Sequence, residues 1–194
     1  AAVGKRERTK QANRAAILAA AREVFAEIGY GAATVRDIIR RTDLAAGTFY
    51  NHFPDKEAVF RALVGEAAER GRERVRAGRA GARTYEELVR GGFRAFFAFI
   101  AEDPVTFALT QRNAGTFRSM FDLETVGAGV ADLREDLDAA VAAGLAPPLD
   151  TEYVAAAMVG VGMEVGLRML RRDPVDPDAA ADFAARLFLT SLPQ

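Results

Sequence analysis

The stretch that decides the fold is TVRDIIRRTDLAAGTFYNHFPDK, from Thr34 to Lys56. Apolar side chains recur in it at helical spacing, which predicts two short helices over Val35–Arg41 and Ala46–His52. Thr34 is placed to cap the first helix, and Pro54 prevents the second from continuing. Two short helices joined by a tight turn are the geometry of a helix-turn-helix, whose second helix enters the DNA major groove.

The second of these helices has an exposed side that can contact DNA. It carries side chains able to hydrogen-bond phosphates or base edges, namely Thr48, Tyr50, Asn51 and His52. A segment from about Asn13 to Gly29 precedes the pair and has an apolar stripe at helical spacing. Packed against the other two helices, this segment would complete a three-helix domain.

Positive charge is concentrated at the N-terminal end of the chain. Residues 1–56 hold ten Lys or Arg against six Asp or Glu, a net charge of +4, and residues 57–194 hold sixteen against twenty-one, a net charge of −5. This asymmetry localises any contact with a polyanion to the N-terminal third. Residues 1–12 carry four basic side chains against one acidic side chain. We expect these residues to be either a mobile arm that strengthens phosphate binding or a solvated, disordered terminus.

Two segments resemble a known protein family. AAGTFYNHFPDKEAVF, residues 45–60, resembles the signature of TetR-family transcriptional regulators, and AAILAAAREVFAEIGYGAATVRDI, residues 15–38, is similar to the first helix and turn of that family. The resemblance implies a three-helix DNA-binding domain, a larger helical domain that binds a small molecule, and a homodimer. It also implies a phosphate contact by Lys56. The predicted DNA-binding residues are Thr34, Arg36, Thr48, Tyr50, Asn51, His52 and Lys56.

The chain departs from the family pattern at the start of the second helix. Asp43 stands at a turn position that is commonly Gly in the family, and Asp tolerates a left-handed backbone less well than Gly. Ala45 and Ala46 stand where the family often has Ser or Lys. We therefore expect an N-cap and a phosphate contact to be missing there, and DNA recognition to depend on residues 48–52.

The composition argues against several kinds of site. The chain has no Cys, which excludes disulfides and thiolate metal sites. Its one His is on the DNA-facing helix, and the Glu-x-x-His pairing of a di-metal bundle is not present. We therefore expect no enzyme, metal site or cofactor. No apolar run approaches the roughly 20 residues that span a bilayer, and nothing resembles a signal peptide, so we expect a cytoplasmic protein that makes no membrane contact.

Helical patterning continues to the end of the chain without strand-like alternation, which predicts an all-α fold. Gly78 and Gly81 indicate a boundary near residue 80. We divide the chain into an N-terminal arm and DNA-binding domain (1–55), a connecting helix and loop (56–80) and a helical effector-binding and dimerisation domain (81–194). The later helices are predicted over 56–76, 84–101, 104–113, 116–143 (breaking near Gly127 and Gly129), 151–172 and 177–191, with Asp55 and Thr84 as N-caps.

A cluster of aromatic residues raises the possibility of a ligand pocket. The candidate ligand-binding residues are Phe93, Phe97, Phe107, Gln111, Arg112, Asn113, Phe117, Met120 and Phe121. Pockets for organic molecules are apolar cavities with a few convergent polar groups, and Arg112 is the candidate to meet a ligand carboxylate or phosphate. Ordinary core packing explains the same aromatic residues equally well, so both interpretations are open.

The segment from Ala155 to Gly166 is apolar nearly all round and rich in small residues. A helix of this kind must be buried on several faces, and its Gly and Ala residues permit close approach of another helix. With the last helix it could form a four-helix dimer interface, for which the candidate residues are Ala156, Val159, Gly160, Met163, Phe183 and Leu187. The alternative is burial within one subunit.

These observations favour a sequence-specific DNA-binding transcriptional regulator, and among such regulators they favour a repressor. Its homodimer would bind a palindromic operator in double-stranded DNA and would be released by a small apolar or amphipathic effector. The alternative is a DNA-binding regulator without a small-molecule effector.

Overall fold

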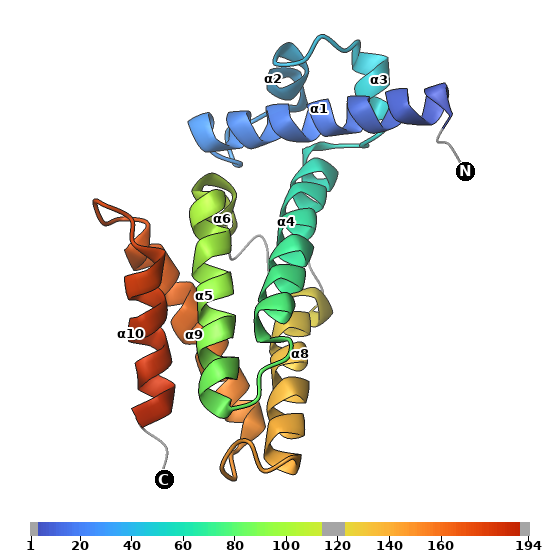
Figure 1. Ribbon diagram of the computed structural model, residues 1–194. Coiled ribbons are helices and arrows are strands. Elements are labelled where there is room, and N and C mark those ends of the chain that lie inside the picture. The colour runs from blue at the N-terminus through green and yellow to red at the C-terminus, as the bar shows by residue number, and fades with distance from the viewer. Residues whose placement is uncertain (1–3, 114–122, 191–194) are drawn as a thin grey trace. The chain divides into compact units, whose positions relative to one another are not determined.

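The computed structural model describes residues 4–113 and 123–190, and within these ranges it contains helices and no strand (Figure 1). The helices are α1 Lys5–Ile28, α2 Val35–Arg40, α3 Ala46–Tyr50, α4 Lys56–Arg79, α5 Tyr85–Glu102, α6 Pro104–Arg112, α8 Leu123–Ala142, α9 Thr151–Met169 and α10 Pro177–Thr190. The predicted all-α fold is confirmed. Among these described helices, none has both the length and the apolar character of a bilayer-spanning segment.

The chain forms two compact units. The first is Ala1–Ala67 together with Val105–Met120, and the second is Ala68–Pro104 together with Phe121–Gln194. Helix α4 contributes its first half to the first unit and its second half to the second unit, and most of α6 belongs to the first.

The first unit is built around an aromatic and aliphatic core. Ile17 and Phe25 of α1, Ile38 of α2, Phe49 of α3 and Phe60 of α4 are each at most 1% exposed. The rings of Phe25 and Phe60 meet edge to face, with their centroids 5.7 Å apart. Because α2 and α3 have only six and five residues, their stability comes from this packing, and for α2 also from its N-cap, rather than from helix propensity.

In the second unit, α5 lies beside α10 and also contacts α9. Phe93 of α5 stacks on Phe97 at 6.0 Å and on Phe188 of α10 at 5.9 Å between centroids. Helix α5 has one strongly apolar face, from Tyr85 to Ile100, which accounts for its central place in this unit.

Helices α4 and α5 approach each other closely through glycine. A Cβ atom on Gly78 would lie 2.8 Å from the carbonyl oxygen of Gly91, and a Cβ on Gly91 would overlap the carbonyl oxygen of Gly78. Two turns before Gly78 on the same face, Gly71 makes room for the ring of Phe99. The absence of side chains at these positions therefore permits backbone-to-backbone contact between the two helices.

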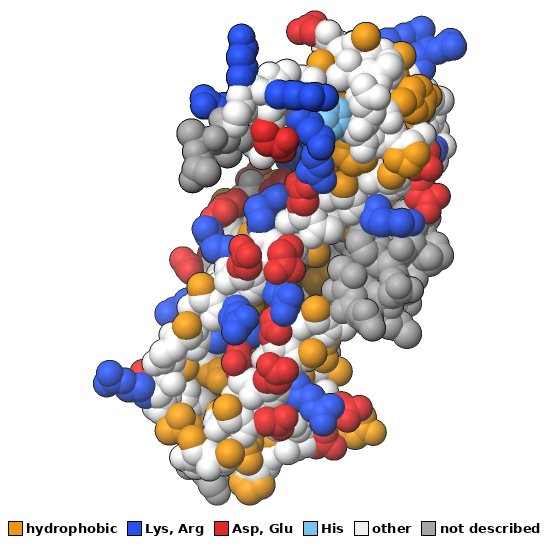
Figure 2. Space-filling view, turned by 90° about the vertical axis from the view of Figure 1, so that its right-hand side faces the viewer, with side chains coloured by type: hydrophobic (Ala, Val, Ile, Leu, Met, Phe, Trp, Pro, Cys, Tyr) orange, Lys and Arg blue, Asp and Glu red, His pale blue; other side chains and the backbone are white. Residues whose placement is uncertain are grey.

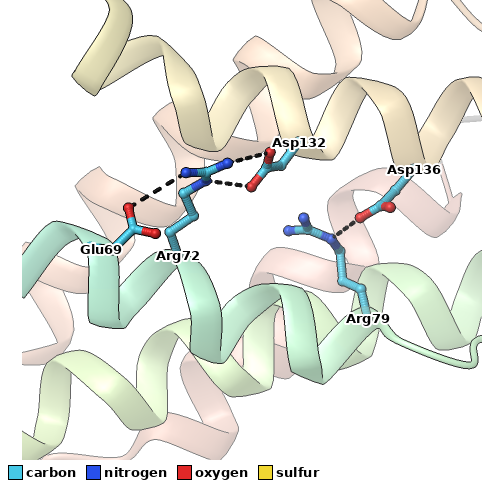
Figure 3. A network of polar contacts seen from close by, with 5 residues as sticks. All are labelled: Glu69, Arg72, Arg79, Asp132 and Asp136. Atoms are coloured by element: carbon cyan, nitrogen blue, oxygen red, sulfur yellow. Dashed lines mark hydrogen bonds and ion pairs between the residues drawn. The ribbon is translucent and has the colours of Figure 1, made fainter.

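Two ion pairs join α4 to α8 (Figure 3). Arg72 donates from Nε and Nη2 to the two carboxylate oxygens of Asp132 at 2.6 and 3.0 Å, and Arg79 donates from Nε to Asp136 at 2.7 Å. The Arg79 side chain is only 6% exposed. The two-pronged pair with Arg72 holds the pKa of the Asp132 carboxyl below its usual value, because the hydrogen bonds favour the charged form.

Several helix bounds differ from those predicted. Helix α1 begins at Lys5, so the predicted mobile or disordered arm is wrong for residues 5–12, which are helical. Helix α4 continues through Gly78 to Arg79, and α8 runs unbroken through Gly127 and Gly129, so the predicted break there is also wrong. Residues 116–122 of the predicted helix over 116–143 lie outside the described part of the chain. The N-caps at Asp55 and Thr84 are confirmed by bonds to the amides three residues on.

Candidate nucleic-acid interface

Helix α2 begins at a reciprocal cap. The Thr34 hydroxyl accepts a hydrogen bond from the Asp37 amide at 3.2 Å, and the Asp37 carboxylate accepts from the Thr34 amide at 3.0 Å and from its hydroxyl at 2.6 Å. These bonds lower the pKa of Asp37, since they stabilise its charged form. The predicted N-cap is therefore confirmed, and it fixes the point where the helix-turn-helix starts.

The turn between α2 and α3 is held by groups that the sequence did not single out. The Thr42 hydroxyl donates to the Ile39 carbonyl at 2.9 Å and accepts from the Leu44 amide at 3.3 Å. Arg41 pairs with Glu23, 3.3 Å away, and with Glu27, both on α1. Asp43 does not adopt a positive φ, so this turn does not require the glycine that the family commonly has. The i, i+4 spacing of the two glutamates was a signal for a basic partner.

Helix α3 is anchored on one side and accessible on the other. Phe49 and the following Phe53 are 1% and 5% exposed, whereas Tyr50 is 57% exposed and Asn51 is also exposed. Thr48 and His52 are half-buried, and His52 lies just beyond the end of the helix. The start of the helix at Ala45 has no side-chain cap, as predicted. Tyr50 and Asn51 are therefore the most accessible of the four predicted recognition residues.

Charged side chains surround this helix pair. Arg36 of α2 is exposed, and Arg14 of α1 lies 5.5 Å from the ring centroid of Phe53 while pairing with Glu66 of α4. Figure 2 draws one face of the molecule. Lys and Arg side chains gather at the end of that face where the one histidine of the chain lies. A basic surface beside a short, polar-faced helix is suited to contact phosphates and base edges.

Lys56 has a different environment from the one expected. Its ammonium donates to the carbonyl oxygens of Tyr30 at 2.9 Å, Gly31 at 3.2 Å and Ala33 at 2.8 Å. It also lies 4.8 Å from the ring centroid of Tyr30. The predicted phosphate contact stays a prediction, but all three ammonium hydrogens already have acceptors within the protein.

The predicted ligand-binding residues fall in different parts of the structure. Phe93 and Phe97 are buried in the second unit, where they pack as ordinary core. The α6 residues Phe107, Gln111 and Arg112, with the following Asn113, belong to the first unit, and Phe117, Met120 and Phe121 lie outside the described residues. A hollow of about 380 Å³ in the second unit is lined by Arg76, Arg79, Leu88, Asp136 and Leu145 among others, and by none of the six candidates that the structure describes. The pocket therefore stays a prediction.

The predicted dimer residues lie on an exposed face of α9 and α10. Ala156 and Gly160 are exposed, Val159 and Met163 are half-buried, and Phe183 and Leu187 are 49% and 42% exposed. A Cβ on Gly160 would meet nothing within 4 Å, whereas a Cβ on Gly162 would lie 3.3 Å from the ring of Phe96. The packing of the described chain thus explains the small size of Gly162 but not that of Gly160.

Comparison with known proteins relates this geometry to a family. Residues 17–63 match the model of bacterial regulatory proteins of the tetR family. The transcriptional repressor Rv1474c of Mycobacterium tuberculosis is 46% identical over 59 residues, which cover 30% of this chain and 32% of that protein. The chain thus spans about a third of the length of the curated relatives it matches.

Two solved structures extend the likeness to the whole fold. The fatty acid degradation regulator FadR of Bacillus halodurans is 26% identical with a TM-score of 0.82, and the alignment covers 100% of both chains. FadR of Bacillus subtilis, solved with stearoyl-CoA, is 23% identical with a TM-score of 0.80, covering 92% of this chain and 99% of that one. The curated relatives are named as helix-turn-helix transcriptional regulators or repressors, and FadR of B. halodurans as a regulator of fatty acid degradation. The N-terminal region of the chain is thus similar to bacterial regulatory proteins of the tetR family, and its whole fold is similar to that of FadR from B. halodurans.

Proposed function

We propose that the protein is a transcriptional repressor whose homodimer binds a roughly palindromic operator and leaves it when a small apolar or amphipathic molecule binds. The observation that carries the proposal is the construction of α3, where buried Phe49 and Phe53 anchor a helix that exposes Tyr50 and Asn51. Because α3 has only five residues, few side chains reach the bases, and phosphate contacts must contribute much of the affinity.

Helix α1 supplies further positive charge to this surface. Lys5, Arg6, Arg8 and Lys10 occupy its first turns, where every residue from Lys5 to Ala12 is exposed. Arg6, Lys10 and Arg14 are spaced by four residues and share one side of the helix, and Arg14 on that side reaches Phe53 and Glu66. We therefore expect Arg6 and Lys10 to flank the helix-turn-helix and to contact the DNA backbone from a rigid helix rather than from a flexible arm.

The dimer is proposed from the exposed apolar surface of α9 and α10. Leaving Phe183 and Leu187 about half exposed is unfavourable in water, and covering them with a second copy would remove this cost. The open space around Gly160 would admit a helix of that copy at close range. A two-fold axis would then present two α3 helices to half-sites about 34–36 Å apart.

The effector is proposed from the fold and from its relatives. FadR of B. halodurans regulates fatty acid degradation, and FadR of B. subtilis was solved with stearoyl-CoA, an apolar chain with an anionic head group. A molecule of this amphipathic class would release the operator only if it bound the DNA-competent and DNA-incompetent shapes with different affinities. Helix α4, which contributes to both units, is the element through which such a preference could be transmitted.

The second candidate function is a DNA-binding regulator without a small-molecule effector. It is favoured by the ordinary core packing of Phe93 and Phe97, which leaves these two side chains no free surface for a ligand. An organic molecule that co-purifies with the protein, and whose addition lowers operator affinity, would exclude this alternative.

The DNA-binding proposal is tested with duplexes selected from a random library by the wild-type protein. Tyr50→Ala and Asn51→Ala should each lower the affinity for the selected duplex by about 1–3 kcal/mol, measured by fluorescence anisotropy, while the circular dichroism and melting temperature stay unchanged. Tyr50→Phe, which keeps the ring, separates the hydroxyl contribution from packing. Wild-type affinity in both alanine variants would refute the assignment of α3 as the recognition helix.

A further inference from the structure

Lys56 is held by the end of the α1–α2 loop. The loop follows α1, whose C-cap is Gly29, and its Tyr30, Gly31 and Ala33 carbonyl oxygens all lie within 3.2 Å of the Lys56 ammonium. An ammonium has three N–H donors and no acceptor, so three carbonyl acceptors use its full hydrogen-bonding capacity. These carbonyls also follow the negative end of the α1 dipole, which favours a cation at this point.

The cost of removing the ammonium from this site is high. The Tyr30 ring, 4.8 Å from Nζ, adds a cation–π contact, and that ring is itself packed against Phe25 and Phe60. Lys56 is half-buried, and two of its three hydrogen bonds are partly buried. If the side chain turned outward to a phosphate, three carbonyls would lose their shared donor.

The position of the loop explains what this contact can do. Ala33, whose carbonyl accepts from Lys56, is 1% exposed and directly precedes Thr34, which caps α2. The lysine itself is the first residue of α4, and Asp55 before it caps that helix. One ammonium therefore connects the start of α2 to the start of α4, the two ends between which the whole helix-turn-helix lies.

We propose that Lys56 is a positioning residue of the DNA-binding surface, which fixes the start of α2 through three loop carbonyls and does not act as a phosphate contact. This inference rests on the proposed function, because it assigns the residue a role in operator binding. Arginine cannot replace lysine in this role, since a planar guanidinium cannot point three hydrogens from one atom at three converging carbonyls. A phosphate contact, in contrast, would accept arginine.

The binding experiment compares Lys56→Met and Lys56→Arg on the duplex selected by the wild-type protein and on a random duplex. Both variants should lose about tenfold or more in affinity for the selected duplex and less than about threefold for the random one. The slope of log affinity against log salt concentration should stay unchanged, because no phosphate contact is lost. A Lys56→Arg variant with wild-type affinity, together with a slope about 0.9 smaller in Lys56→Met, would overturn the proposal.

A measurement on the unmodified protein covers the case in which a variant does not fold. The ¹⁵N resonance of the Lys56 ammonium, identified by its absence in Lys56→Arg or by a selectively labelled sample, should be visible in the free protein and keep its position when DNA is added. A signal that becomes visible or shifts only with DNA would contradict the inference. If the wild-type protein selects no duplex, the proposed function fails, whereas a protected ammonium would still establish the carbonyl contacts.

Discussion

Each of the two compact units is stabilised internally by a different kind of contact. In the first, α2 and α3 are too short to be stable alone and are fixed by side chains that bond to backbone groups, such as Thr34, Thr42 and Lys56. In the second, longer helices pack against each other directly, and Gly78 and Gly91 bring two backbones into contact.

The exposed surfaces of the units differ in the same way. The first exposes polar groups such as Asn51 and Arg36, while the second exposes apolar groups such as Phe183. A surface built from precise polar contacts suits recognition of a polar partner, and a smooth apolar surface suits burial against another helix. We therefore propose DNA contact for the first unit and self-association for the second, and each part of this proposal can be tested.

The largest effect on stability is expected where α4 and α5 touch through Gly78 and Gly91. Gly91→Ala places a methyl group on the Gly78 carbonyl oxygen, so the helices must separate along their length. We expect a loss of about 3 kcal/mol in the free energy of unfolding, even after the helix propensity gained from alanine. Urea denaturation followed by circular dichroism measures it.

The neighbouring glycine provides the control for that substitution. A Cβ on Gly92 would meet only the flexible stem of Arg79, at 3.3 and 3.4 Å. Gly92→Ala should therefore change stability by no more than about 1 kcal/mol in either direction. Equal destabilisation by the two variants would mean that close backbone contact is not what holds α4 against α5.

The apolar surface of the second unit is tested by Phe183→Glu. If Phe183 lies in the proposed dimer interface, a charge there should raise the dimer dissociation constant by at least about 100-fold, because a large apolar contact is replaced by a carboxylate that loses its hydration. Analytical ultracentrifugation measures the constant. The control is Ile28→Glu, which changes a similarly exposed apolar side chain in the first unit and should leave the dimer intact. A Phe183→Glu protein that dimerises like the wild type would place the interface elsewhere.

Much of the first unit could be predicted because its signals are local. A threonine before Val35, an aspartate before Lys56 and a repeating apolar pattern each indicate structure within a few residues, and all correspond to caps or core positions. The start of α1 was missed because residues 5–12 have no buried side and thus no apolar pattern. Their strong helix formers, Lys, Arg, Glu and Gln, were the remaining signal.

Contacts between distant segments could not be predicted in the same way. Gly78 and Gly81 look alike in sequence, yet Gly78 lies inside α4 against α5, while Gly81 adopts φ +77° in the turn that follows. The role of Lys56 depends on backbone carbonyls, which every residue has and no sequence pattern reveals. The DNA-binding set could therefore be proposed from side-chain type, but the division between contacting and positioning residues required the fold.

A smaller effect on DNA affinity is expected from the basic residues in the first turns of α1. Replacing them tests whether this part of α1 contacts DNA as a rigid helix. Replacing Arg6 and Lys10 together by Gln should weaken binding to the selected duplex by about tenfold and reduce the salt slope by up to about 1.8, since each lost phosphate contact contributes about 0.9. The matched control, Lys5→Gln with Arg8→Gln, removes the same charge from the other side of the helix. Electrophoretic or anisotropy titrations over a range of salt concentrations distinguish the two pairs.

The outcome of that test depends on helix geometry as well as charge. Gln11→Pro should unwind the first turns while keeping every basic residue, because proline at this position removes a helix hydrogen bond and clashes with the preceding turn. It should therefore reduce affinity as the Arg6 and Lys10 double variant does. Equal losses in the two double variants, with no loss in Gln11→Pro, would instead describe a flexible basic tail that acts by net charge alone.

The smallest effect concerns the polar contacts that the second unit does have. The Arg72 pair lowers the pKa of Asp132, so its stabilising contribution is present above the unfolded-state pKa of about 3.9 and is lost as the pH falls through the lower folded-state value. Asp132→Asn should lower the melting temperature by about 4 °C at pH 7, and the difference from the wild type should shrink as the pH falls below the unfolded-state pKa of about 3.9. Glu57→Gln, which breaks the exposed pair with Arg61 on the same helix, should have no measurable effect at either pH. If the Asp132 variant melted like the wild type at pH 7, the Arg72 ion pair would not contribute measurably to the stability of the second unit. Direct helix packing would then be what stabilises this unit, in contrast to the polar contacts that fix the short helices of the first.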